Sequence, residues 1–225
     1  MLNPANQCHL GCPSCTNSYN REFTERTYNQ WPRGLMTAET FDTFSQQVGL
    51  YAFNGHFYNN HEPLLNKLTP SFVRKATDMR IRTFISSNLS YRKIDAEAIV
   101  ASGLTELMVA ADGVTQPVYE RYRKGGNIEW VLDNARALVE AKRKMKSMTP
   151  VLRWQFLSFA HNVHELPAAI AVTKEIGFDT FNVATPLPVN MDDPSIDTIE
   201  YDGQKHFEFR PRQSMPFTGS LPIAT

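Results

Sequence analysis

The sequence predicts an α/β fold in which parallel strands alternate with helices to form an open or partial barrel. Short runs rich in Val, Ile, Phe and Thr are typical of mostly buried strands, and helical segments separate them. Strand followed by helix, repeated along the chain, implies right-handed crossovers and a parallel sheet with the helices outside. The chain holds five or six such units, which indicates an open or partial barrel.

Five segments have the composition of buried strands, with β-branched and aromatic side chains prominent. They are residues 54–60, 81–88, 106–112, 151–159 and 178–184. Only Met1–Gln7 precede Cys8, so we expect any strand before these five to be short.

Apolar residues at helical intervals predict five helices around these strands. The predicted helices are residues 37–51, 69–79, 95–103, 127–145 and 164–177. Thr37 and Thr69 are expected to cap the start of their helices, because threonine side chains accept from unpaired N–H groups there. Gly103 and Gly177 are expected to end theirs.

The composition excludes several function classes. Lys and Arg number 23 against 23 Asp and Glu, and 42% of the residues are hydrophobic, as in a soluble globular protein. The basic run 142–146 closes a predicted helix, where positive charge complements the macrodipole, so we expect no nucleic-acid partner. No apolar run approaches the roughly 20 residues that span a bilayer, and no signal peptide is evident. We therefore expect a cytoplasmic protein without a membrane partner.

The chain divides into a large core and a short tail. Strand and helix alternation extends over residues 1–186, which we interpret as one domain. Residues 187–225 are rich in Pro and Ser and lack periodicity, so we expect an irregular C-terminal tail.

All three cysteines of the chain, Cys8, Cys12 and Cys15, lie in one short stretch. An odd, clustered set of thiols favours a reducing compartment. A structural zinc site needs four ligands, so a histidine such as His9 or His61 would have to complete it, without supporting spacing. Buried cysteines acting as small hydrophobes have no reason to cluster in a polar loop. Three thiolates on a tight turn suit a cubane iron–sulfur cluster whose fourth iron stays open.

The stretch CHLGCPSC resembles the Cys-x3-Cys-x2-Cys signature of the radical S-adenosylmethionine (SAM) enzymes. Other segments agree with this resemblance. NNHEPLLNKLTPSFVRKA resembles the family's Gly-Gly-Glu-Pro segment, TFISSNLS its Thr-Asn-Gly strand end, VAADGVTQPVYERYRKGG its fourth strand and following loop, and WQFLSFAHNVHEL its fifth strand. Together they cover the chain from about Asn3 to Ala184 in the family's order.

The resemblance implies a partial (β/α)6 barrel with catalytic groups at the carboxyl ends of the strands. It implies that the three cysteines bind a [4Fe–4S] cluster and that SAM chelates the fourth iron. Reductive cleavage of SAM would then give a 5′-deoxyadenosyl radical that abstracts a hydrogen atom. The substrate would be a small organic, sugar-type or peptide-linked molecule, in an oxidoreductase or isomerase type of reaction. A flavodoxin- or ferredoxin-type protein would donate the electron.

The resemblance also suggests residues that bind SAM. Glu62 matches the family carboxylate near the methionine ammonium group, although an exposed loop carboxylate is the alternative. Asp112 lies at a strand end that faces the ribose in relatives, although a turn-forming Asp before Gly113 is nearly as plausible. Further candidate polar contacts are Asn88, Gln155, Arg123 and Arg153. His161 and His164 flank a helix start, where helix-entry polarity explains them equally well.

The chain departs from the family pattern at several positions. Ser14 stands where an aromatic residue is common, and Asn60 and His61 stand where the family has Gly-Gly. The stretch YDGQKHFEFRPRQSMPF resembles the linker to a cysteine-rich SPASM extension, yet no cysteine follows. Two alternatives to an active enzyme therefore remain, a catalytically impaired barrel of the same kind and a zinc-binding module.

Overall fold

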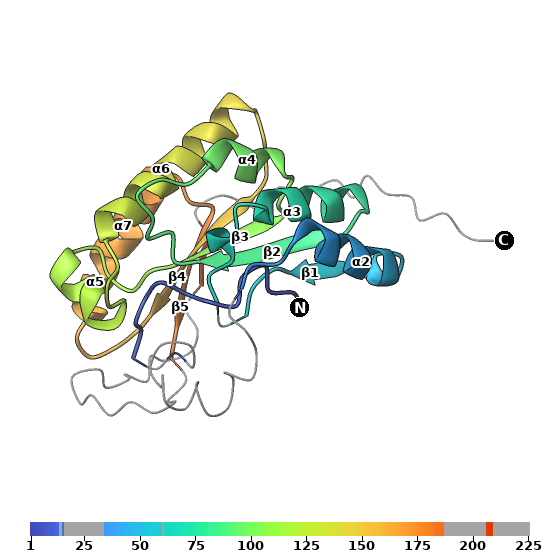
Figure 1. Ribbon diagram of the computed structural model, residues 1–225. Coiled ribbons are helices and arrows are strands. Elements are labelled where there is room, and N and C mark those ends of the chain that lie inside the picture. Colours follow the sequence, from blue (N-terminus) through green and yellow to red (C-terminus); the bar gives the residue numbers. More distant parts are fainter. Residues whose placement is uncertain (14, 16–33, 60, 187–205, 209–225) are drawn as a thin grey trace.

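A curved six-stranded sheet forms the centre of the molecule in the computed structural model (Figure 1). The structure describes residues 1–13, 15, 34–59, 61–186 and 206–208. The sheet order is β1-β2-β3-β4-β5-β6, with β1 to β5 parallel and β6 antiparallel to β5. The strands are β1 (Asn54–His56), β2 (Arg82–Ser87), β3 (Glu106–Ala110), β4 (Val151–Leu157), β5 (Thr180–Ala184) and β6 (His206–Glu208).

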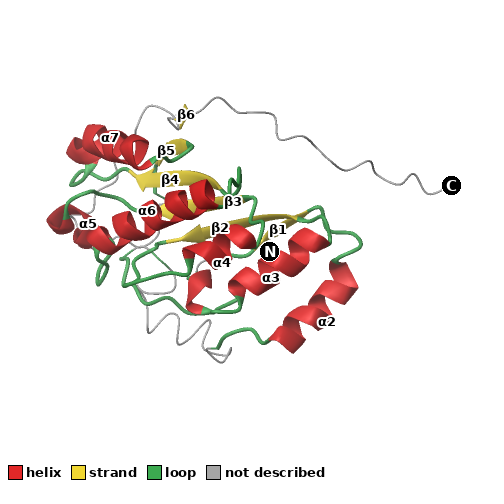
Figure 2. Cartoon of the chain, turned by 90° about the horizontal axis from the view of Figure 1, so that it is seen from above, coloured by secondary structure: helices red, strands yellow, loops and turns green. Residues whose placement is uncertain are grey.

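Helices connect successive strands and lie along the outside of the sheet (Figures 1 and 2). The α-helices are α2 (Ala38–Val48), α3 (Thr69–Asp78), α4 (Ala96–Ala101), α5 (Gln116–Tyr122), α6 (Ile128–Lys144) and α7 (Leu166–Ile176). Two short 3-10 helices are η1 (Pro63–Leu65) and η2 (Val163–Glu165). The parallel sheet does not close, so the predicted α/β partial barrel is confirmed.

The two faces of the sheet differ because side chains alternate along each strand. On β4, Leu152, Trp154 and Phe156 are fully buried against the core. Arg153 and Gln155, between them, are only half-buried and lie on the opposite face. One face of the sheet therefore packs against the core, while the other keeps polar side chains partly open to solvent.

All five predicted strands are confirmed, but the expected short first strand is not found among the described residues. The N-terminal segment instead forms one backbone hydrogen bond to β1, from Leu2 N to the His56 carbonyl at 2.8 Å, and an isolated antiparallel bridge between Ala5 and Leu35. Asn66 fixes this segment by donating from Nδ2 to the Pro4 carbonyl at 2.8 Å.

Two predicted helix boundaries are corrected. Thr69 does not cap α3, because it is the first helical residue and its Oγ1 donates to the Pro63 carbonyl at 2.7 Å. Ser102 is the C-cap of α4, and Gly103 follows it with φ +73°, a conformation that favours glycine. Thr37 caps α2 and Gly177 ends α7, as predicted.

Helix α5 lies where the sequence analysis predicted a loop. Its start carries Pro117 in the first turn, and its buried residues Tyr119 and Tyr122 are three apart. Those features are signals of a short helix that the apolar periodicity of a longer window does not detect.

The tail lies almost entirely outside the described residues. Within the predicted irregular segment, β6 is a strand that pairs with β5. The division at residue 186 into core and tail therefore stays a prediction. Among the described residues, no helix combines the length and apolar character that crossing a membrane requires.

Candidate functional site

The segment Gln7–Cys12, here called the cysteine loop, is anchored by backbone hydrogen bonds to two loops, one after β1 and one after α5. After β1, Glu62 N donates to the Gln7 carbonyl at 3.0 Å. After α5, the Lys124 carbonyl accepts from Gly11 N at 2.9 Å. Both loops lie beyond the carboxyl ends of parallel strands, the edge at which barrels of this kind place their chemistry.

The loop after β2 provides a side-chain contact to the same segment. His9 Nε2 donates to the Ser90 carbonyl at 3.0 Å, and its ring lies 4.8 Å from that of Tyr91. Burial lowers the pKa of His9. Because the Nε2 position is occupied, His9 does not offer that nitrogen as a fourth zinc ligand.

The three thiols share one small apolar cluster and form no disulfide. Cys12 is buried, while Cys8 and Cys15 are half-buried beside Tyr122 and Phe159. A hydrogen bond from Cys15 N to the Cys12 carbonyl, 3.1 Å long, closes the turn between the last two. Burial raises the pKa of Cys8 to about 11 and that of Cys12 to about 12. Both are therefore neutral thiols when nothing is bound.

N–H groups point at the sulfur atoms. Leu10 N lies 3.5 Å and Asn88 Nδ2 3.7 Å from Cys8 Sγ. Arg123 Nη1 lies 3.9 Å from Cys12 Sγ. Such donors stabilise negative charge on sulfur, and around iron–sulfur clusters they tune the metal. Asn88, predicted as a cofactor contact, thus lies against a cysteine.

The arrangement fits a cubane better than a single ion. No group of three or more His, Cys, Asp or Glu side chains converges on one metal position within the described residues. A zinc ion would need its thiolates gathered about 2.3 Å from one centre. In a cubane each thiolate binds a different iron, so the sulfur atoms stay farther apart. Three thiols that share one apolar cluster without forming a disulfide meet that looser requirement.

Glu62 is buried, and its hydrogen bonds join the loops after β1 and β2 to the cysteine loop. Its Oε1 accepts from Leu64 N at 3.2 Å and caps η1, and its Oε2 accepts from Asn88 N at 2.8 Å. Burial raises the pKa of Glu62, opposed by these N–H donors. The predicted alternative of an exposed loop carboxylate is therefore wrong, since the residue is 2% exposed.

Asp112 and Arg123 form a buried ion pair beside the cysteine loop. Arg123 Nε donates to Asp112 Oδ2 at 2.6 Å, and Asp112 Oδ1 accepts from Leu157 N at 2.8 Å. Burial raises the pKa of Asp112, while the nearby carboxylate raises the pKa of Arg123 well above its usual value. These directions oppose each other. We take the ionised pair as the state present, because both carboxylate oxygens accept N–H bonds.

Arg153 and Gln155 are not brought to the cysteines by any contact among the described residues. Arg153 pairs with Glu106 across β3 and β4, at 3.0 Å between Nε and Oε1. Gln155 lies opposite Ala110 and Asn182 on the same open face. Their predicted cofactor contacts stay predictions, and both residues line the wall of the partial barrel.

Two functional supports were missed by the sequence analysis. Buried Glu165 accepts from Val114 N at 2.7 Å and from the Thr115 hydroxyl, which fixes the loop after β3. Buried Asn162 donates to the Asp112 carbonyl at 2.9 Å. Both residues lie in the segment around His161 and His164, so polar side chains of this segment form hydrogen bonds with the loop after β3. The His161 ring stacks on Phe159, and His164 is exposed.

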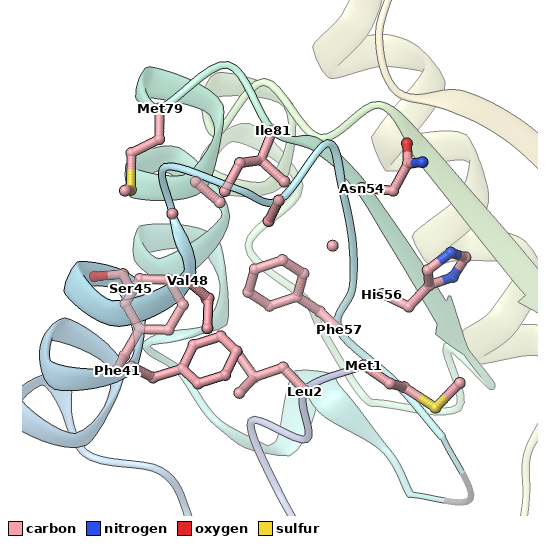
Figure 3. Close-up of a pocket in the computed structure, with 15 residues that line it drawn as sticks. Met1, Leu2, Phe41, Ser45, Val48, Asn54, His56, Phe57, Met79 and Ile81 are labelled. Carbon is pink, nitrogen blue, oxygen red and sulfur yellow. The ribbon is translucent and has the colours of Figure 1, made fainter.

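An apolar cavity of about 260 Å³ lies elsewhere in the molecule (Figure 3). Its walls include Phe41 and Val48 from α2, Phe57 just after β1 and Ile81 just before β2. Residue Ile81 precedes β2, so the cavity is near the amino ends of the strands, opposite the cysteine loop. It is therefore not the candidate site. Ser14 and Asn60, two of the departures noted in the sequence, lie outside the described residues.

Comparison with known proteins gives one curated relative and several related folds. The chain is 24% identical over 173 residues to a protein of Methanocaldococcus jannaschii named "Probable GTP 3′,8-cyclase", a match that covers 76% of this chain and 53% of that protein. The chain thus spans about half the length of this relative.

Solved structures share the fold. Streptococcus suis SuiB bound to S-adenosylmethionine matches with a TM-score of 0.63 at 14% identity, over 89% of this chain and 42% of SuiB. Methylornithine synthase matches with a TM-score of 0.55 at 14% identity, over 83% of this chain and 52% of the synthase.

The family model described as "Radical SAM superfamily" matches residues 2–155, which include all three cysteines and strands β1 to β3. Members of that superfamily use a [4Fe–4S] cluster and SAM as cofactors. The three cysteines, which form no disulfide, and the strand-end loops that surround them agree with this match. The chain belongs to the radical SAM superfamily.

Proposed function

We propose that this protein is a radical SAM enzyme that abstracts a hydrogen atom from a small organic, sugar-type or peptide-linked substrate. The observation that carries the proposal is the group of three thiols in and beside the cysteine loop, of Cys8, Cys12 and Cys15, which form no disulfide and lie at the carboxyl edge of a parallel sheet. The proposed enzyme core is residues 1–186.

Cys8, Cys12 and Cys15 would hold the cluster. When bound, the [4Fe–4S] cluster supplies the electron that splits SAM to methionine and a 5′-deoxyadenosyl radical. Asn88 and Arg123 would stabilise the thiolates through N–H groups directed at sulfur.

Glu62 would orient the cosubstrate by charge. Its carboxylate is fixed by two backbone N–H groups, beside the loop that carries Cys8. A fixed anion of this kind favours an ammonium group such as that of methionine.

The open face of the sheet is the proposed substrate wall. It carries the ion pair of Arg153 and Glu106, together with Gln155 and Asn182, all half-buried. Polar and charged groups that are only partly satisfied favour a polar substrate. SuiB, a structural relative, was solved with a precursor peptide, which supports keeping peptide-linked substrates in the class. Oxidation or isomerisation would follow hydrogen abstraction.

A flavodoxin- or ferredoxin-type protein is the proposed electron donor, and a reducing compartment such as the cytoplasm is the proposed location. Three cysteines without a disulfide agree with such a compartment.

Anaerobic reconstitution with iron and sulfide, followed by dithionite and SAM, tests the proposal. We expect about four irons per chain and release of 5′-deoxyadenosine. Cys12→Ala is the matched control, because it removes one buried sulfur from the loop. Equal 5′-deoxyadenosine from both proteins, or a colourless protein that takes up one zinc ion, would overturn the proposal.

One observation favours a second candidate, a barrel that binds the cluster without cleaving SAM. His61 stands next to Glu62 where the family has glycine, and its half-buried Nδ1 has no hydrogen-bond partner. This ring would crowd the methionine group. If the second candidate holds, the wild type forms the cluster without cleaving SAM, and His61→Gly restores cleavage.

A further inference from the structure

Arg123 is a nearly buried cation with one side directed at a cysteine. Its side chain is 12% exposed, and Nη1 lies 3.9 Å from Cys12 Sγ. Its plane also packs on Tyr122, with Cζ 5.2 Å from the ring centroid. The side chain of a surface arginine changes conformation readily, whereas that of Arg123 is held by the Tyr122 ring and by Asp112.

Asp112 is placed so that it anchors Arg123. The Asp112 side chain is fully buried, and its two oxygens accept from Arg123 Nε and Leu157 N. Its backbone carbonyl accepts from Asn162 Nδ2 at 2.9 Å. Both carboxylate oxygens are thus engaged within the protein, and the ribose contact suggested for Asp112 by the resemblance stays a prediction.

Arg123, and not Asp112, is the charged group that faces Cys12 Sγ. Arg123 donates toward Cys12, whereas the carboxylate of Asp112 accepts from Arg123 and β4 behind it. In agreement, Arg123 lowers the pKa of Cys12 more than Asp112 raises it, although burial outweighs both. The ion pair is neutral as a whole but presents positive charge to the cysteine loop.

We propose that Asp112 is a positioning residue that holds Arg123 against Cys12, and that this oriented pair raises the reduction potential of the cluster. The inference rests on the proposed function. One-electron reduction of the cluster from the 2+ to the 1+ state, by an external low-potential donor, adds a negative charge at the thiolate-bound iron. A fixed cation and an N–H donor at sulfur both stabilise that state. An electron donor with a less negative potential would then be able to reduce the cluster.

The test compares reconstituted variants in a mediated redox titration followed by EPR, without SAM. The main variant is the double substitution Asp112→Asn with Arg123→Gln, which keeps the pair neutral and hydrogen-bonded and so avoids a lone buried charge. We expect a fall of at least tenfold in the equilibrium constant for reduction, which is 59 mV for a one-electron couple. Arg123→Lys keeps the charge but loses the planar group that donates to Asp112 and toward Cys12 at once, so we expect a potential between those of the wild type and the double variant.

A surface control separates orientation from general charge. Arg121→Gln removes an exposed cation two residues away and should leave the potential unchanged. An unchanged potential in the double variant would overturn the inference while leaving the proposed function intact. Failure of the wild type to take up iron and sulfide would overturn the proposed function and this inference with it. In Asp112→Asn alone, the loss of a negative charge would by itself raise the reduction potential. A fall in the potential would therefore show that Asp112 acts by positioning Arg123, and a rise would reject that role.

Discussion

Glu62 accepts the backbone N–H of Asn88 at 2.8 Å, so a single carboxylate joins the loops after β1 and β2 beside the cysteine loop. The same carboxylate caps η1 through Leu64 N. Glu62 therefore fixes the backbone near Cys8, and in the proposed function it would also supply a negative charge there.

Glu62→Gln removes the charge and keeps part of the hydrogen bonding. Glutamine has one acceptor oxygen, so it retains one of the two accepted N–H bonds and loses the other. We expect the cluster to assemble while SAM cleavage slows at least about tenfold, the cost of one lost charge-assisted bond. Released 5′-deoxyadenosine and bound iron should be measured on the same sample. The control Glu175→Gln alters an exposed carboxylate on α7 and should leave both values unchanged. Wild-type cleavage by Glu62→Gln would reject the role in SAM binding.

Asn134 on α6 holds the loop after β2. Its Nδ2 donates to the carbonyls of Leu89 at 3.0 Å and Tyr91 at 2.7 Å, and its Oδ1 accepts from Ile94 N at 3.2 Å. Asn134→Ala leaves buried backbone groups unpaired, so we expect about 2–3 kcal/mol lower free energy of unfolding.

Urea denaturation of the apo protein measures this loss. Arg136→Ala, on the exposed side of the same helix, should change stability by less than about 0.5 kcal/mol, because its pair with Asp133 is exposed. Similar losses in the two variants would contradict the role assigned to Asn134.

The strands and most helices were predictable because their signals are local. The five parallel strands, the Thr37 cap and the Gly177 ending follow from composition and spacing. Helix α5 escaped prediction because it is short and its buried face consists of Tyr119 and Tyr122. The same helix turns Arg123 back toward Asp112, so the ion pair could not be inferred before the helix was known.

The types of residue in the site were easier to predict than the directions in which their side chains point. Arg123 and Arg153 had equal standing in the sequence, since both were predicted as candidate polar contacts. In the structure Arg153 is the third residue of β4 and pairs with Glu106 on the open face, while Arg123 follows α5 and contacts a cysteine. The register of β4 and the orientation of α5 decide this difference, and a short sequence motif specifies neither.

His61 provides a test of pH dependence. Burial lowers its pKa from the usual value near 6.5, so the folded state favours the neutral ring. The unfolded chain then binds more protons below about pH 6.5, and stability falls as pH decreases through that value. We expect His61→Gln to reduce the loss of stability between pH 7.5 and about pH 5.5.

The urea midpoint at the two pH values measures this effect. His164→Gln replaces an exposed imidazole and should retain the wild-type slope. If His61→Gln lost stability with falling pH as steeply as the wild type, burial of His61 would not be a source of the dependence.

Thiol alkylation of the reduced apo protein tests the burial of the cysteines. Burial raises the pKa of Cys12 to about 12, so at pH 8 only about one molecule in 10⁴ carries the thiolate, against about a quarter for a free cysteine. We expect iodoacetamide to modify Cys12 at least about 100-fold more slowly than an unstructured cysteine. Because the pKa lies above the range tested, the rate should rise about tenfold per pH unit from about pH 8 to 10.

Peptide mass mapping after timed quenching gives the rate at each cysteine, and the same protein in urea provides the unfolded reference. Cys8, with its pKa raised to about 11, should show the same steep dependence with a faster rate. A rate at Cys12 that levels off below about pH 9 would mean an ordinary thiol pKa near 8.5. The sulfur would then be open to water, and the packing of Cys12 with Tyr122 and Phe159 would not protect it.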